Sequence, residues 1–190
     1  LLTVCMSLHS YGQKTYELSS PDGKLKMSVN LSDKIYYDVV CLNDTLLKQC
    51  NLRMEINNQS LGINPKPAKI SRKGIDELLT PIVPLKYSAV PNQYNQLLMA
   101  FKGNYSIEFR AFNDGIAYRF ITNQKGQIEV NSETFRVNFP ENYRLHVQQS
   151  GGFKTAYEEE YRHIQSHEWK TSDPMIHLPV LIDTQKDYKI

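Results

Sequence analysis

The sequence predicts an all-β domain, built as an antiparallel β-sandwich. Turn residues recur at intervals of about 8–12 residues, the spacing typical of sandwiches and barrels. Between the turns, β-branched and aromatic side chains alternate with polar ones, as in strands with one buried and one solvated face. A length of 190 residues with 41% hydrophobic residues suits one domain with a packed core. The net charge of only +2 argues against a nucleic-acid partner.

The chain opens with an apolar run, residues 1–8, that is too short to span a bilayer, which takes about 20 residues. Small residues follow at Ser10 and Gly12, where they fit the subsites of signal peptidase. We therefore expect residues 1–12 to be the last part of a signal peptide, with the mature protein beginning at Gln13. A buried first strand is the alternative. We expect no transmembrane segment in the chain.

The first strands are separated by turns of known chemistry. Pro21 fixes φ and Gly23 accepts a positive φ, so residues 20–23 are expected to form a turn. After this turn, apolar and polar residues alternate through residues 24–31. Strands are expected at residues 15–18, 24–31, 35–42 and 45–56.

The middle of the chain has a different composition. Residues 57–93 contain five prolines, which predict an excursion over the surface with one short strand at 81–87. Asn113, Asp114 and Gly115 then predict a hairpin turn in which Gly115 is left-handed. Further strands are expected at residues 94–102, 105–112, 116–122, 127–130, 134–139, 145–149 and 177–182, with another beginning at 188. Only residues 155–168 suit a helical turn.

The cysteines leave two possibilities open. Cys5 lies in the predicted signal peptide, and Cys41 and Cys50 lie across a possible hairpin. These two residues could form a disulfide in an oxidising compartment or remain small buried thiols.

An acidic segment follows Gly151 and Gly152. Glu158, Glu159 and Glu160 are consecutive, and three carboxylates cannot all be buried without cations or pKa shifts. Either the segment is a solvated acidic loop, or at least one carboxylate meets an arginine or a hard cation such as calcium.

The histidines offer a weaker hypothesis. His163, His167 and Glu168 form the pattern H-x-x-x-H-E, which would place both histidines on one face of a helix. The zinc-protease pattern, however, has its Glu directly after the first His, where this chain has Ile164. Surface histidines are therefore the preferred interpretation. His146 and His177 are expected on strands.

No complete arrangement for nucleophilic catalysis is present, because the sequence has no Gly-x-Ser-x-Gly, no phosphate-binding glycine loop and no CxxC pair. Adjacent glutamates on one loop also do not flank a glycosidic bond from two sides. Aromatic residues near the acidic segment could stack on a sugar ring or belong to the core. These residues are Phe153, Tyr157, Tyr161 and Trp169.

Three stretches together resemble the amino-terminal domain of glycoside hydrolase family 97, a family of secreted α-glycosidases. They are residues 18–23 (LSSPDG), residues 109–120 (FRAFNDGIAYRF), and the stretch from Tyr157-Glu158 through Tyr161 to residues 178–182 (LPVLI). The resemblance covers about residues 15–190. It implies a β-super-sandwich akin to galactose-mutarotase-like domains, occupying residues 13–190 and truncated at its carboxyl-terminal end.

The resemblance also implies a function. Such domains pack on a (β/α)8 barrel that carries the catalytic residues, and that barrel is absent here. One glutamate of the domain is a calcium ligand, which matches Glu158, with Glu160 as the second choice. We therefore expect part of a calcium-dependent α-glucosidase or α-galactosidase that acts on oligosaccharides in the periplasm or at the outer membrane of a Gram-negative bacterium. The alternative is a non-catalytic carbohydrate-binding sandwich.

Overall fold

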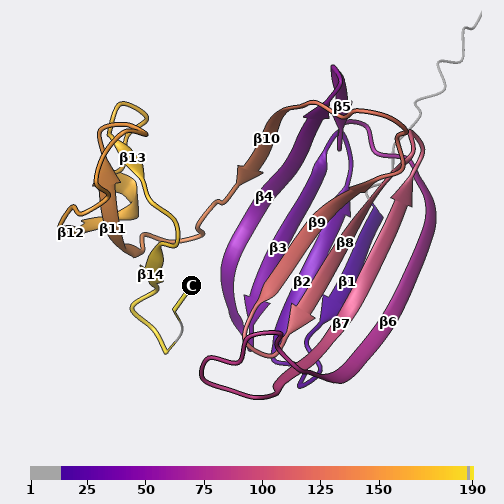
Figure 1. The fold of residues 1–190 in the computed structure, drawn as a ribbon, viewed down its shortest axis with the longest axis horizontal. Coiled ribbons are helices and arrows are strands. Elements are labelled where there is room, and N and C mark those ends of the chain that lie inside the picture. Colours follow the sequence, from indigo (N-terminus) through magenta and orange to yellow (C-terminus); the bar gives the residue numbers. More distant parts are fainter. Residues whose placement is uncertain (1–13, 188) are drawn as a thin grey trace, which may run out of the picture. The chain divides into compact units, whose positions relative to one another are not determined.

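The computed structural model describes residues 14–187 and 189–190 (Figure 1). The predicted signal peptide and its boundary at Gln13 lie outside these residues. The chain divides into two compact units, Leu1–Asn138 and Phe139–Ile190, and each is described by itself. The regular secondary structure of the described residues consists of strands and one 3₁₀ helix, so the all-β prediction is confirmed. None of their helical structure has the length and apolar character needed to cross a membrane.

The first unit contains two antiparallel sheets that form two layers (Figure 1). The first sheet has the order β1-β2-β3-β4-β10, and β5 pairs with β4. Its strands are β1 (Lys14–Ser19), β2 (Leu25–Leu31), β3 (Ile35–Cys41), β4 (Asp44–Ile56), β5 (Gln59–Leu61) and β10 (Val130–Arg136). The second sheet has the order β6-β7-β8-β9. Its strands are β6 (Pro67–Leu79), β7 (Val90–Phe101), β8 (Tyr105–Phe112) and β9 (Ile116–Thr122).

The core of the first unit lies between these two sheets. Strands β1 and β2 lie against β7 and β8, and the inward-facing residues of both layers are removed from solvent. The fully buried side chains include Val29, Ile35 and Leu52 from the first sheet and Leu97, Met99, Ile107 and Phe109 from the second. The alternation predicted for residues 24–31 is confirmed, because Leu25, Met27, Val29 and Leu31 are buried.

The two predicted turns have different outcomes. At residues 20–23, Gly23 donates its backbone N–H to Ser20 O at 3.0 Å and has a φ of 75°, as expected. The hairpin at Asn113–Gly115 is also present, and Phe112 N–H donates to Gly115 O at 2.8 Å. The left-handed conformation predicted for Gly115 is wrong, because its φ lies outside that region. The last pair between β8 and β9 is Ala111 with Ile116, so four residues connect the paired positions. Four-residue hairpin loops are most often built around a type I turn, which has negative φ angles.

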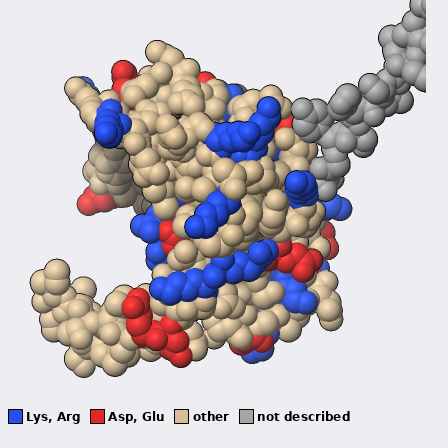
Figure 2. Space-filling model, turned by 90° about the vertical axis from the view of Figure 1, so that its right-hand side faces the viewer, with Lys and Arg blue, Asp and Glu red and all other residues tan. Residues whose placement is uncertain are grey.

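The prediction for residues 57–93 is also wrong. This region holds β5, all of β6 and the start of β7, whereas residues 81–87 are not a strand. Strand β6 lies at the edge of its sheet, and most of its side chains are exposed on both faces. Because neither face is fully buried, the sequence shows no alternation of apolar and polar residues. Figure 2 shows Lys and Arg side chains on the side of the molecule where β6 lies, and such charges discourage pairing with another strand.

Two other strand boundaries differ from the expectation. The strands predicted at 127–130 and 134–139 form the single strand β10, all of whose side chains are exposed, so its sequence also carries no alternation. The strand predicted at 177–182 is present only as β14 (Leu181–Asp183).

Cys41 and Cys50 are free thiols. The possible disulfide between them is therefore not formed.

The second unit is a small sheet around a central strand, β11 (Arg144–Ser150). Strands β12 (Tyr161–Gln165), β13 (Met175–Ile176) and β14 all pair with β11 in antiparallel fashion. The 3₁₀ helix η1 (Ser166–Glu168) follows β12 and falls within the range predicted for a helical turn. The buried side chains of this unit include Tyr143, Leu145 and Val147.

Candidate calcium-ligand loop

The acidic segment lies in the loop between β11 and β12, which spans residues 151–160. Its own hydrogen bonds shape the loop. Ser150 Oγ donates to Gly152 O at 2.6 Å, and Tyr157 Oη donates to Phe153 O at 2.7 Å. Tyr157 itself has a φ of 58°, in the left-handed region that is uncommon for a bulky residue. The loop therefore has a defined internal structure before it enters β12.

All three glutamates of this loop are exposed. Within residues 14–187 and 189–190, no side chain forms an ion pair or hydrogen bond with the carboxylates of Glu158, Glu159 or Glu160. The backbone carbonyl of Glu159 accepts a hydrogen bond from Gln148 Nε2 on β11, which holds the loop to the sheet. The carboxylates are thus available to a partner from outside the described residues.

These carboxylates alone do not make a metal site. Among the described residues, no group of three or more His, Cys, Asp or Glu side chains could hold a metal ion. Calcium takes 6–8 oxygen ligands, and carboxylates are among those it prefers. The chemistry of Glu158 or Glu160 therefore fits one ligand of a calcium site, and the other oxygens have to come from elsewhere.

The structure separates His163 from His167. His163 lies on β12 and His167 lies in η1, so they do not share a helix face and the zinc hypothesis based on that face is wrong. Instead, His163 lies directly opposite His146 of β11, with 2.7 Å between the two Nδ1 atoms. One imidazole donates and the other accepts in this contact. Sequence reasoning missed the pair because only the strand register brings the two residues together.

The structure also gives the positions of Glu168, the last residue of the H-x-x-x-H-E pattern, and of His146 and His177, which were both expected on strands. Glu168 Oε2 accepts the backbone N–H of Gln165 at 2.7 Å, so this carboxylate caps η1. His146 is on a strand as expected, whereas His177 lies just after β13. Tyr157 packs on the ring of His177 with 4.8 Å between the centroids.

The aromatic side chains near the loop divide into two groups. Phe153 and Tyr161 are 83% and 64% exposed, so they are not part of the core and could stack on a ligand. Trp169 is half-buried. The aromatic surface that sequence analysis associated with the acidic segment is thus reduced to Phe153, Tyr161 and the partly exposed Tyr157.

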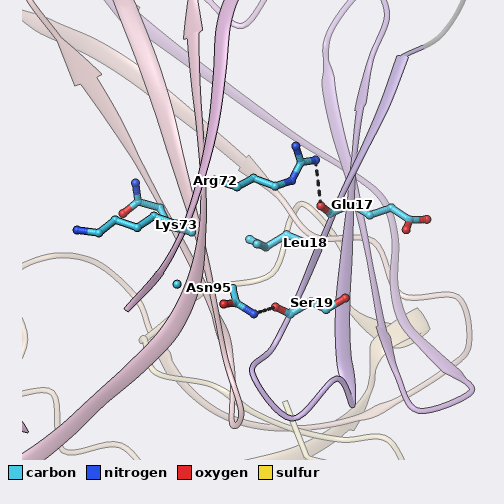
Figure 3. Close-up of a pocket in the computed structure, with 8 residues that line it drawn as sticks. Glu17, Leu18, Ser19, Arg72, Lys73 and Asn95 are labelled. Carbon is cyan, nitrogen blue, oxygen red and sulfur yellow. Dashed lines mark hydrogen bonds between the residues drawn. The ribbon is translucent and has the colours of Figure 1, made fainter. Parts of the chain in front are cut away.

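Two cavities lie away from the loop carboxylates. One, in the second unit, has a volume of about 370 Å³ and is lined by residues that include Arg162, Lys170 and Asp173. The other, in the first unit, measures about 300 Å³ and lies between β1 and the β6–β7 pair (Figure 3). There Arg72 and Asn95 donate to the backbone carbonyls of Glu17 and Ser19 at 3.3 and 2.9 Å. These bonds close the open edge of the sandwich, which is a structural role.

Comparison with known proteins places this fold in a family. Residues 18–190 match the model of the glycosyl-hydrolase 97 N-terminal domain. A retaining α-galactosidase of Bacteroides thetaiotaomicron is 38% identical over 141 residues, which are 74% of this chain and 21% of that protein. The chain therefore belongs to the family of glycosyl-hydrolase 97 N-terminal domains, and the resemblance found in its sequence is confirmed.

Solved structures share the fold of this chain. A β-arabinopyranosidase superposes with a TM-score of 0.72 at 25% identity, covering 88% of this chain and 29% of that one. A glycoside hydrolase family 97 enzyme from Pseudoalteromonas sp. strain K8, in complex with acarbose, also gives 0.72, at 21% identity over 88% of this chain and 26% of that one. The chain thus spans less than a third of the length of these relatives.

Proposed function

We propose that the chain is the amino-terminal domain of a secreted, calcium-dependent α-glycosidase that acts on α-galactosides or α-glucosides. The observation that carries this proposal is the family match over residues 18–190, together with 38% identity to a retaining α-galactosidase. That relative favours a galactoside as the substrate.

The proposed role of this domain is to support catalysis carried out by another part of the polypeptide. Hydrolysis of a glycosidic bond needs two carboxyl groups on opposite sides of the bond, and Glu158–Glu160 form one local surface. We assign the catalytic carboxyls to a (β/α)8 barrel on which the domain packs. The length of the α-galactosidase, of which this chain spans 21%, leaves room for such a barrel.

Within this role, Glu158 would supply one calcium ligand, and Glu160 is the second choice. The support is that both carboxylates are exposed and lack partners among the described residues. Bound calcium would contribute a positive charge that orients or polarises the substrate. The exposed Phe153 lies on the same loop, and the exposed Tyr161 is the first residue of the strand that follows it. Both side chains could contact a sugar ring.

Secretion is the remaining part of the proposal. It rests on residues 1–12, whose apolar run and small residues at Ser10 and Gly12 suit cleavage by signal peptidase. Export would place the enzyme in the periplasm or at the outer membrane of a Gram-negative bacterium.

The test is an assay of the full-length gene product on nitrophenyl α-galactoside and nitrophenyl α-glucoside, each with calcium and with a chelator. We expect hydrolysis of one substrate, abolished by the chelator and restored by added calcium. A folded protein that binds oligosaccharides but hydrolyses neither substrate would establish the non-catalytic carbohydrate-binding sandwich instead. Hydrolysis that is unaffected by the chelator would support the glycosidase activity and contradict the calcium site.

A further inference from the structure

The β6–β7 connection exposes an unusual amount of apolar surface. We call residues 78–90, where β6 ends and β7 begins, the hairpin tip (Figure 1). Ile82 and Leu85 are 101% and 93% exposed, so their side chains are about as accessible to solvent as in an extended chain. The other exposed apolar residues of the hairpin tip are Leu78, Leu79, Val83, Tyr87 and Val90.

The first unit does not use these side chains for its own stability. The buried residues of β7 are Tyr94, Leu97, Met99 and Phe101, in the part of the strand that lies beyond the hairpin tip. Monomeric proteins rarely expose a contiguous apolar patch larger than a few hundred Å², and larger patches mark interaction sites. Seven large apolar side chains at one end of a hairpin therefore indicate a surface that is covered in the functional protein.

The composition of the hairpin tip suits an apolar protein surface. Lys86 is its only charged residue, and Pro81 and Pro84 restrict the backbone. A restricted loop loses less conformational entropy when it binds. A segment that lies on a membrane would be expected to carry several Lys or Arg beside its apolar residues, which the hairpin tip does not.

The size of the hairpin tip also favours one kind of occupant. A stable interface between separate molecules takes about 20–30 residues from each partner, and the hairpin tip offers fewer than that. A partner on the same polypeptide needs less contact area, because covalent linkage gives it a high effective concentration. The alignment with the α-galactosidase covers 21% of that protein, so most of its length lies outside the aligned region.

We infer that the hairpin tip docks on an apolar surface of the polypeptide that follows residue 190 in the full-length protein, with Ile82 and Leu85 as its central contacts. This inference rests on the proposed function, which places a catalytic barrel in that part of the polypeptide. It assigns the contact to a particular loop of the first unit, far along the chain from the glutamates of the acidic segment.

Photo-crosslinking in the full-length protein tests the inference. The photoreactive residue p-benzoylphenylalanine replaces Ile82 in one variant and Leu85 in a second, and Lys125, exposed between β9 and β10, in a matched control. We expect irradiation to join positions 82 and 85 to peptides beyond residue 190 at least tenfold more often than position 125. Mixing isotopically light and heavy protein shows that these crosslinks lie within one molecule.

Other crosslinking patterns would overturn the inference. Crosslinks to residues 139–190 would show that the second unit covers the hairpin tip, and crosslinks between light and heavy copies would show self-association. Crosslinks to added phospholipid vesicles, or none above the control, would likewise remove it. The readout is independent of hydrolysis, so an inactive protein with crosslinks beyond residue 190 would refute the glycosidase and support the docking.

Discussion

Arg119 of β9 donates its Nε–H to Glu108 Oε2 of β8 at 2.6 Å, directly across the strand pair. Arg110 Nε donates to the other carboxylate oxygen at 2.6 Å and lies over the ring of Tyr94. Glu108 is only 3% exposed. Burial opposes its ionisation, but the hydrogen bonds and charges of the two arginines outweigh burial and hold the pKa of Glu108 below its usual value. The family-like stretch at residues 109–120 thus contains both partners of a buried carboxylate.

Replacing this carboxylate should destabilise the first unit. We expect Glu108→Ala to lower the free energy of unfolding by about 2 kcal/mol, because hydrogen bonds to charged groups contribute about 1.5–3 kcal/mol each and Arg119 is largely solvated. Urea unfolding measures the change. Glu129→Ala, at an exposed position, is the matched control and should stay within about 0.5 kcal/mol of wild type. Equal stability of the two variants would contradict this assignment.

The same carboxylate should contribute to the pH dependence of stability. Its pKa is lowered from 4.5 in the folded protein, so its contribution is complete above that value and is lost as pH falls through the folded pKa. We expect the stability difference between wild type and Glu108→Gln to be constant from about pH 7 to about pH 5.5 and to shrink below pH 4.5. Unfolding at several pH values tests this. Other carboxylates with a lowered pKa, such as Asp22 and Glu55, are present in both proteins. Their contributions therefore cancel in the stability difference. A difference that grows in acid would show the opposite sign of linkage.

Two buried tyrosines should differ in how loss of the hydroxyl changes the stability of the protein. Tyr37 Oη is buried and makes no hydrogen bond within the described residues, and its cross-strand neighbour is Cys50, whose thiol is a weak partner. Tyr105 Oη accepts the backbone N–H of Gly62 at 3.2 Å. We expect Tyr37→Phe to be neutral or stabilising and Tyr105→Phe to cost about 1 kcal/mol or more, because it leaves a buried donor unsatisfied. Thermal unfolding of both variants compares them directly, and a larger loss for Tyr37→Phe would reverse the assignment.

Burial on one face decided which strands the sequence could predict. Strands β2 and β8 each bury one face against the opposite sheet, so their residues alternate and both strands were predicted. Strands β6 and β10 are edge strands with mostly exposed side chains, so their residues do not alternate. As a result β6 was expected to be a surface excursion, and β10 was predicted as two separate strands. Prolines added to the error. Pro67 is the first residue of the edge strand β6, a position where a strand tolerates proline, and Pro91 is the second residue of β7.

In the candidate site, too, the sequence could indicate local features but not contacts that depend on strand pairing. The run of glutamates and the glycines before it left two alternatives open, a solvated acidic loop or a carboxylate that meets an arginine or a cation. The structure shows the three glutamates exposed in a loop. The pairing of His146 with His163 depends on the register between β11 and β12, and the sequence contains no signal for that register. Helical spacing suggested His167 as the partner of His163, but the chain is extended at His163.

The calcium role of Glu158 can be tested at the level of single carboxylates. In the full-length protein, we expect Glu158→Gln to weaken calcium binding at least tenfold, about 1.4 kcal/mol, because an amide lacks the charge of a ligating carboxylate. Activity at limiting calcium should fall with it and recover in excess calcium. Glu159→Gln is the matched control, since neighbouring side chains in the loop diverge, and it should bind calcium as wild type does. Calorimetric titration with calcium gives the affinities. Loss of binding in Glu160→Gln alone would move the ligand to Glu160, and wild-type affinity in both variants would remove this loop from the calcium site.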